Sequence, residues 1–194
     1  MSNAVQDSPA TALADATRGT RSLRNLYYVR FGFAVAWAIL LATVAATITP
    51  TAIVLIIIYP LFDVAAAVID FRSSGTTRPK APLFVNMGLS SLTAASLAVA
   101  TGSGIPNVLR VWGAWAITAG IVQFIVAVLR YRLGGQWAMI LSGGISTVAG
   151  ISFIIMAGGP NASLTSVAGY AILGGVFFLI SAIRLHRTIA KAAR

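Results

Sequence analysis

The residues of this sequence that could do chemistry are few, and its carboxylates stand first among them. The chain has 194 residues, with four Asp, no Glu, one His and no Cys. Without Cys there is no thiolate metal site and no Cys nucleophile, and a single His is too few for a multi-His metal centre. We therefore expect no metal, no cofactor and no enzyme activity. Binding of a proton or a cation is the chemistry that is left.

Asp63 is the most informative carboxylate because it lies inside an apolar run of membrane-spanning length. An Asp at the centre of a bilayer helix costs about 2.5–3.5 kcal/mol on insertion scales, so its carboxyl should be protonated, paired or facing water. Arg30 is the basic residue at comparable depth in the preceding apolar run. We predict that Arg30 and Asp63 form an intramembrane polar pair.

Two interpretations of this pair are open from the sequence. In the first, Asp63 is a proton or cation site, and Pro60 one turn earlier supports it by leaving a helix carbonyl free. In the second, the bond between Arg30 and Asp63 only locks two helices together. We favour the lock and keep transport past Asp63 as the alternative.

Composition decides the fold class. Hydrophobic residues make up 58% of the chain and charged residues 9%. The mean hydropathy of +0.87 is too high for a water-soluble surface of this size. Six apolar stretches have the ~20 residues that a bilayer helix needs, namely 26–48, 51–71, 82–101, 107–129, 136–157 and 164–184. The sequence predicts an all-α, six-helix transmembrane bundle, with a disordered tail over 1–25 and a basic tail over 188–194.

The distribution of charge predicts the orientation of this bundle. Of the 14 Lys and Arg residues, all except Arg110 belong to the two terminal regions or to the second and fourth connections. The positive-inside rule therefore places both termini in the cytoplasm. We expect the partners of these basic residues to be the lipid bilayer and its anionic headgroups, and no nucleic acid.

Landmark residues recur along the chain with a period of about 56 residues. A glycine, a turn proline and a mid-helix aromatic residue each occur three times at this spacing: Gly32, Gly88 and Gly144; Pro50, Pro106 and Pro160; Tyr59, Trp115 and Tyr170. One period holds two helices, so each copy enters and leaves the membrane on the same side. The sequence predicts three tandem helical hairpins over 26–80, 81–134 and 135–187.

The recurring glycines suggest where helices pack. Small residues let helix backbones approach closely inside a membrane. We therefore expect Gly32, Gly88 and Gly144 to be helix-packing positions within one chain, with contacts in a homo-oligomer as the alternative.

Polar residues also recur in the repeat. Arg30, Asn86 and Ser142 each lie two residues before a repeat glycine. If the hairpins surround a pseudo-threefold axis, these side chains would form one polar layer near the cytoplasmic mouth of a central cavity. The alternative is that they only hold adjacent helices together.

The hairpin pattern, with its glycine, outer proline and second-helix aromatic residue, resembles the HdeD-like family of short-repeat bacterial membrane proteins over about residues 25–187. The sequence departs from the Arg-Gly and Asp-Gly pairs expected of that family, with Arg30-Phe31-Gly32 and Asp63-Val64 in their place. The resemblance implies a six-helix protein of the bacterial inner membrane with a role in acid or envelope stress tolerance. It supplies no catalytic or transport residues. A small transporter or channel for protons, cations or a small solute is the alternative function.

Overall fold

The computed structural model describes residues 9–73, 81–129 and 137–192. These residues form six α-helices and one 3-10 helix. The elements are α1 (Pro9–Thr43), α2 (Pro50–Ser73), α3 (Ala81–Ala100), η1 (Thr101–Ser103), α4 (Ile105–Leu129), α5 (Trp137–Ala157) and α6 (Thr165–Ala192). Each of the six α-helices contains a segment long and apolar enough to cross a membrane. The predicted all-α architecture with six spans is confirmed.

Local sequence explains where the helices begin. Pro50 is the first residue of α2, where its missing N–H costs nothing. The Oγ1 of Thr49 accepts a hydrogen bond from the backbone N–H of Ala52 at 3.1 Å and caps this helix. Before α4, Gly104 has a φ of 89°, a left-handed conformation that glycine adopts without strain. The predicted turns at the first two prolines are thus built from ordinary capping chemistry.

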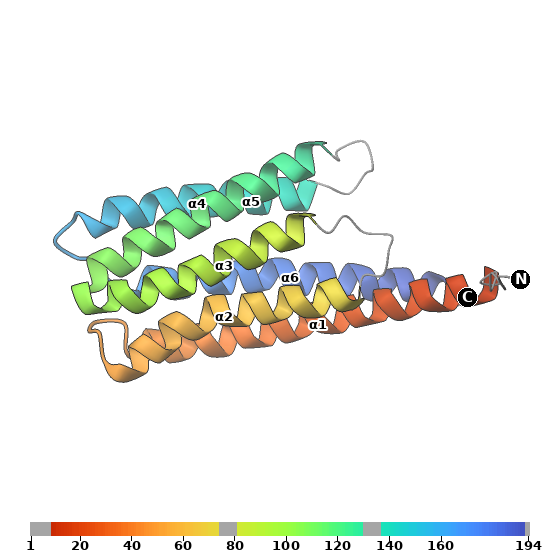
Figure 1. Cartoon of the computed structure of the whole chain (residues 1–194), viewed down its shortest axis with the longest axis horizontal. Helices are drawn as coiled ribbons and strands as arrows, with labels where there is room; N and C mark the ends of the chain where they lie inside the picture. The colour runs from red at the N-terminus through yellow and green to blue at the C-terminus, as the bar shows by residue number, and fades with distance from the viewer. Residues whose placement is uncertain (1–8, 74–80, 130–136, 193–194) are drawn as a thin grey trace, which may run out of the picture.

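The six helices form a closed ring around one core. Figure 1 shows them side by side along a common direction, with both chain termini at one end, which we call the terminal end. The most extensive packing joins α1 to α6, α2 to α3 and α4 to α5, whereas α1 with α2, α3 with α4 and α5 with α6 pack less extensively. Packing therefore alternates around the ring, and the first and last helices close it.

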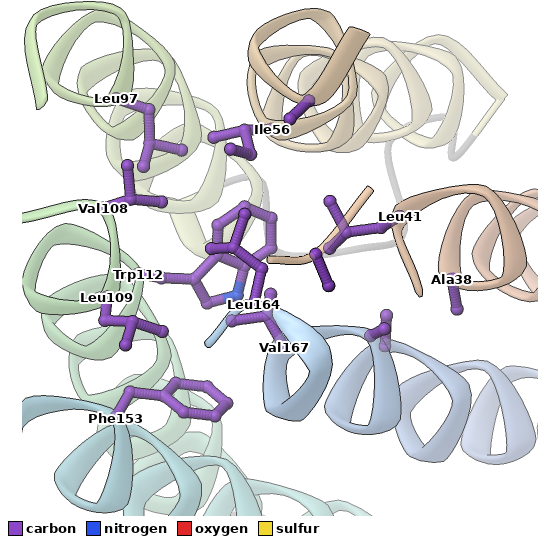
Figure 2. Packing of buried hydrophobic residues seen from close by; sticks show 14 of the residues in the cluster. Ala38, Leu41, Ile56, Leu97, Val108, Leu109, Trp112, Phe153, Leu164 and Val167 are labelled. Carbon is purple, nitrogen blue, oxygen red and sulfur yellow. The ribbon is translucent and has the colours of Figure 1, made fainter. Parts of the chain in front are cut away.

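Large apolar side chains from all parts of the ring fill its centre. Trp112 of α4 is fully buried, and so are Leu41 of α1, Ile56 of α2 and Leu97 of α3. In Figure 2 these side chains point toward a common centre around Trp112, with Phe153 of α5 completing the lower left. The core lies between Asp63 and the end of the bundle opposite to the termini.

The two terminal regions differ from the prediction. Helix α1 begins at Pro9, so residues 9–25, predicted to be disordered, are helical, and α6 continues into the predicted basic tail as far as Ala192. Leu23 and Leu26 are buried, and the ring of Tyr27 packs 5.7 Å from that of Phe178. Although the composition of this region is polar, α1 and α6 continue to pack there along a narrow apolar contact.

Several predicted features lie outside the described residues. Among the basic residues these are Arg78, Lys80, Arg130, Arg132 and Arg194. The disorder expected for residues 1–8 also concerns a segment that the structure does not describe.

The closest approach of two helices is between α4 and α5. A Cβ added to Gly113 would lie 2.6 Å from the carbonyl oxygen of Gly150, and one added to Gly120 would lie 2.7 Å from that of Gly143. Real Cβ atoms do not come so close to a backbone oxygen, so only glycine fits at these positions. The two glycines of each helix are seven residues apart and face each other in antiparallel pairs.

The recurring glycines Gly32, Gly88 and Gly144 do not have this role within the chain, and the prediction that they pack its helices together is wrong; contacts in a homo-oligomer stay a prediction. A Cβ added to any of them would meet nothing within 4 Å. Gly32 and Gly88 are exposed on the surface of the bundle. Spacing along the chain identified equivalent positions in the sequence, but it did not identify the helix face on which they lie.

Candidate functional site

Asp63 lies on α2, ten residues before the terminal end of that helix, and is 7% exposed. Pro60 lies inside the same helix and is buried. A proline there removes one backbone hydrogen bond without ending the helix. The carboxylate is therefore held on a rigid element, inside the bundle and away from both helix ends.

Arg30 of α1 supplies the positive charge that faces Asp63. Its Nη2 donates to Oδ1 of Asp63 in a salt bridge. The guanidinium also lies over the ring of Phe178 on α6, 4.2 Å from the ring centroid, in a cation–π contact. The structure thus brings together the two residues that the sequence predicts as partners, and Arg30 joins α1 to both α2 and α6.

Helix α3 provides the remaining partners of the carboxylate. The Nδ2 of Asn86 donates to Oδ2 of Asp63 at 2.7 Å, and the Oγ of Ser90 donates to the same oxygen at 2.8 Å. Asn86 and Ser90 are four residues apart and so share one helix face. Three donors from two helices therefore bind a carboxylate that belongs to a third.

Sequence reasoning missed Ser90 as a partner of Asp63. The signal was present, because Ser90, Thr93 and Leu97 lie on one face of α3 and are all buried. A polar residue four positions after Asn86 on that stripe is placed to reach the same partner.

The site carries no net charge, since the Arg30 cation and the Asp63 anion cancel. Opposite charges that are paired and hydrogen-bonded are the form in which a membrane interior tolerates ionisable residues. Removing one partner of such a pair leaves the other charge uncompensated. The network therefore stabilises the contact between α1, α2, α3 and α6 while both charges are present.

The predicted polar layer of Arg30, Asn86 and Ser142 is formed only in part. Arg30 and Asn86 both contact Asp63, but Ser142 is half-buried on α5 and takes no part in the network. Helix α5 packs mainly on α4, on the opposite side of the ring from α2. Two of the three residues therefore meet. Both contact the carboxylate of Asp63, which does not recur at the spacing of the repeat.

Other polar side chains make separate contacts between helices. Gln123 of α4 donates through Nε2 to the backbone oxygen of Met139 on α5 at 3.2 Å. The hydroxyls of Ser146 on α5 and Tyr170 on α6 lie 2.8 Å apart. These bonds join α4 to α5 and α5 to α6.

Aromatic rings fill the bundle on the side of Asp63 that faces away from the termini. The rings of Trp37 and Trp112 stack at 5.5 Å, and Tyr59 lies 4.5 Å from Trp37 and 5.7 Å from Trp112. The indole N–H of Trp37 donates to the backbone oxygen of Leu55 at 2.6 Å. The polar network therefore has an aromatic layer between it and the opposite end of the bundle.

The two remaining candidate side chains lie at the surface. Arg110 is exposed near the start of α4 and donates to Oδ1 of Asn107 at 2.6 Å. His186 is exposed on the last part of α6. Within the described residues, no three of the His, Asp and Glu side chains gather into a group that could hold a metal.

Comparisons with known proteins add no relative. No family model matches the chain, and neither curated proteins nor solved structures show a match. The fold by itself defines the class, which is a protein with six candidate membrane-spanning helices that fits a multi-pass membrane protein. The chemistry of the site is that of one carboxylate with a cationic partner and two neutral donors.

Proposed function

We propose that this chain is a non-enzymatic protein of the bacterial inner membrane, and that the Asp63 network holds its helices together. The observation that carries the proposal is the set of three protein donors around the carboxylate, with Arg30, Asn86 and Ser90 all donating to Asp63. Ionisable residues that hold a membrane protein together are paired with one another inside the bundle. A carboxylate bound by donors from two other helices favours the lock.

A role in acid or envelope stress tolerance follows from the resemblance to HdeD-like proteins. A membrane protein that must persist in acid benefits from helices that are held by packing as well as by charge. The glycine pairs between α4 and α5 supply such packing in the half of the ring that lacks the Asp63 network.

The three-hairpin organisation is part of the same proposal. Two observations support it: packing alternates around the ring with a period of two helices, and Tyr59, Trp115 and Tyr170, the recurring aromatics, all pack against one core cluster. With both termini on one face, as the positive-inside rule requires, that face is cytoplasmic and its basic residues contact anionic headgroups. A homo-oligomer is the alternative assembly.

A second candidate function is transport of a proton, a cation or a small solute past Asp63. The observation that favours it is that the side chains of Arg30 and Asp63 are 17% and 10% exposed at the surface of the bundle. Ionisable residues that face a water-filled cavity inside a membrane mark ion and proton pathways.

One experiment separates these functions. Acid survival, proton leak and membrane abundance are measured for the wild type, Asp63→Asn, Arg30→Gln and the double variant. For a lock, each single variant lowers abundance and acid survival together, leak per molecule does not change, and the double variant recovers part of the loss because no charge is left unpaired. Normal abundance of Asp63→Asn with loss of a flux that the wild type shows would replace the lock with transport.

A further inference from the structure

A groove outside the Asp63 network lies between α3 and α4. Its volume is about 180 Å³, and one side is open. Pro82 of α3 and Met139 of α5 line it near the terminal end, while Leu89 and Ala119 line it deeper in the bundle. From Pro82 to Leu89 a helix rises roughly 10 Å. The groove is thus a slot that follows the helices inward from the terminal end.

The walls of the groove combine apolar side chains with two carboxamides. Asn86 and Gln123 line it from opposite sides. Each already donates one hydrogen bond to the protein, Asn86 to Asp63 and Gln123 to the backbone oxygen of Met139. A carboxamide has a second N–H and an oxygen to offer. The groove can therefore hold an apolar chain and satisfy a polar group beside it.

The charge at this end of the bundle indicates the head that such a ligand carries. Arg72 is exposed at the end of α2, the helix that packs on α3, whereas the basic residues of α6 lie across the ring from the groove. Anionic headgroups are attracted to basic residues at a membrane surface.

We infer that this groove binds one acyl chain of an anionic phospholipid, with the headgroup at the terminal end. The inference rests on the membrane location of the proposed function. The acyl chain lies against Leu89 and Ala119, and the ester groups of the lipid contact Asn86 and Gln123. Since Asn86 also holds Asp63, the bound lipid orders a side chain of the Asp63 network.

Native mass spectrometry of the purified full chain tests this inference. The protein is stripped with detergent and then titrated with phosphatidylglycerol or, separately, with phosphatidylcholine. Wild type should bind one phosphatidylglycerol tightly and phosphatidylcholine less tightly. Ala119→Phe fills the groove and should weaken the phosphatidylglycerol site about tenfold or more, a loss of roughly 1.4 kcal/mol at tenfold. Ala114→Phe, at an exposed position of the same helix, is the matched control and should bind as the wild type does.

A photoactivatable acyl chain provides the second measurement and does not depend on the variant folding. On the wild-type chain, adducts should concentrate on 82–89 and 119–126. Adducts spread evenly over all exposed helix faces would overturn the inference, as would equal lipid binding by Ala119→Phe and the wild type. A dimer mass that Ala119→Phe abolishes would assign the groove to a second copy instead. Neither readout depends on stress tolerance or on Asp63 chemistry, so failure here is distinguishable from failure of the proposed function.

Discussion

Asn86 and Ser90 lie one helical turn apart on α3, and both donate to the same carboxylate oxygen of Asp63. The other oxygen accepts from Arg30. Helix α3 thus binds one oxygen of the carboxylate, and Arg30 of α1 binds the other. The contact of α3 with α2 therefore depends on neutral donors, whereas that of α1 with α2 depends on charge.

The salt bridge between Arg30 and Asp63 predicts that the effects of mutating these two residues on stability are strongly non-additive. Asp63→Asn or Arg30→Gln alone should destabilise the protein by about 3–5 kcal/mol, because each leaves a buried charge unpaired. The double variant should lose less than the sum of the two. Thermal unfolding in detergent, monitored by circular dichroism, compares the stabilities of the wild type, the two single variants and the double variant. Additive losses would show that the two side chains do not act as a pair.

The neutral half predicts a smaller effect at Ser90. Ser90→Ala removes a buried donor from Asp63 and should cost about 1–3 kcal/mol. Ser91→Ala changes the next residue, which is exposed, and should leave the stability unchanged. Comparing the two unfolding midpoints in the same detergent checks the prediction. Equal midpoints for Ser90→Ala and Ser91→Ala would contradict a stabilising hydrogen bond from Ser90 to Asp63.

The glycine pairs predict which glycines tolerate a methyl group. Gly113→Ala and Gly150→Ala force α4 and α5 apart and should destabilise by about 1–3 kcal/mol each, as overpacking does. Gly32→Ala and Gly88→Ala meet open space and should be neutral or slightly stabilising, since alanine favours helix. Membrane abundance and unfolding temperature distinguish the two groups. The opposite ranking would return the recurring glycines to the packing role.

The aromatic layer predicts a large loss at Trp112. Trp112→Ala opens a cavity at the centre of the ring and should cost about 3–5 kcal/mol. Trp137→Ala is the control, because that side chain is 60% exposed and faces away from the core. Intrinsic fluorescence and thermal unfolding report on both variants. A Trp112→Ala protein as stable as the control would mean that the centre of the bundle is not packed as described.

The sequence predicts the spans well because a bilayer imposes a length and an apolar composition on every helix. It also predicts the partnership of Arg30 and Asp63, since an isolated carboxylate in a membrane requires a partner and few are present. It does not predict the role of Ser90 or the separation of Ser142 from the network. Those depend on which helices are neighbours and on how each is rotated, and neither follows from spacing along one chain.

The glycines show the same limit of prediction from the sequence. A period of 56 residues identifies Gly32, Gly88 and Gly144 as matching positions in the sequence. The seven-residue spacing of Gly113 with Gly120, and of Gly143 with Gly150, is the better indicator of contact, because it marks one face of a straight helix over two turns. Packing depends on the helix face on which a glycine lies, and the repeat period does not indicate that face.

The contact between α1 and α6 has a consequence for biosynthesis. Among the described helices, α6 packs on α1 and is translated after it: a Cβ added to Gly175 would lie 3.2 Å from that of Ala34, and Phe178 stacks on Arg30. Until α6 is translated, one side of α1 has only lipid beside it, and the guanidinium of Arg30 lacks its aromatic neighbour. Chains cut short before α6 should therefore insert five spans and still be recognised as unfinished by membrane quality control.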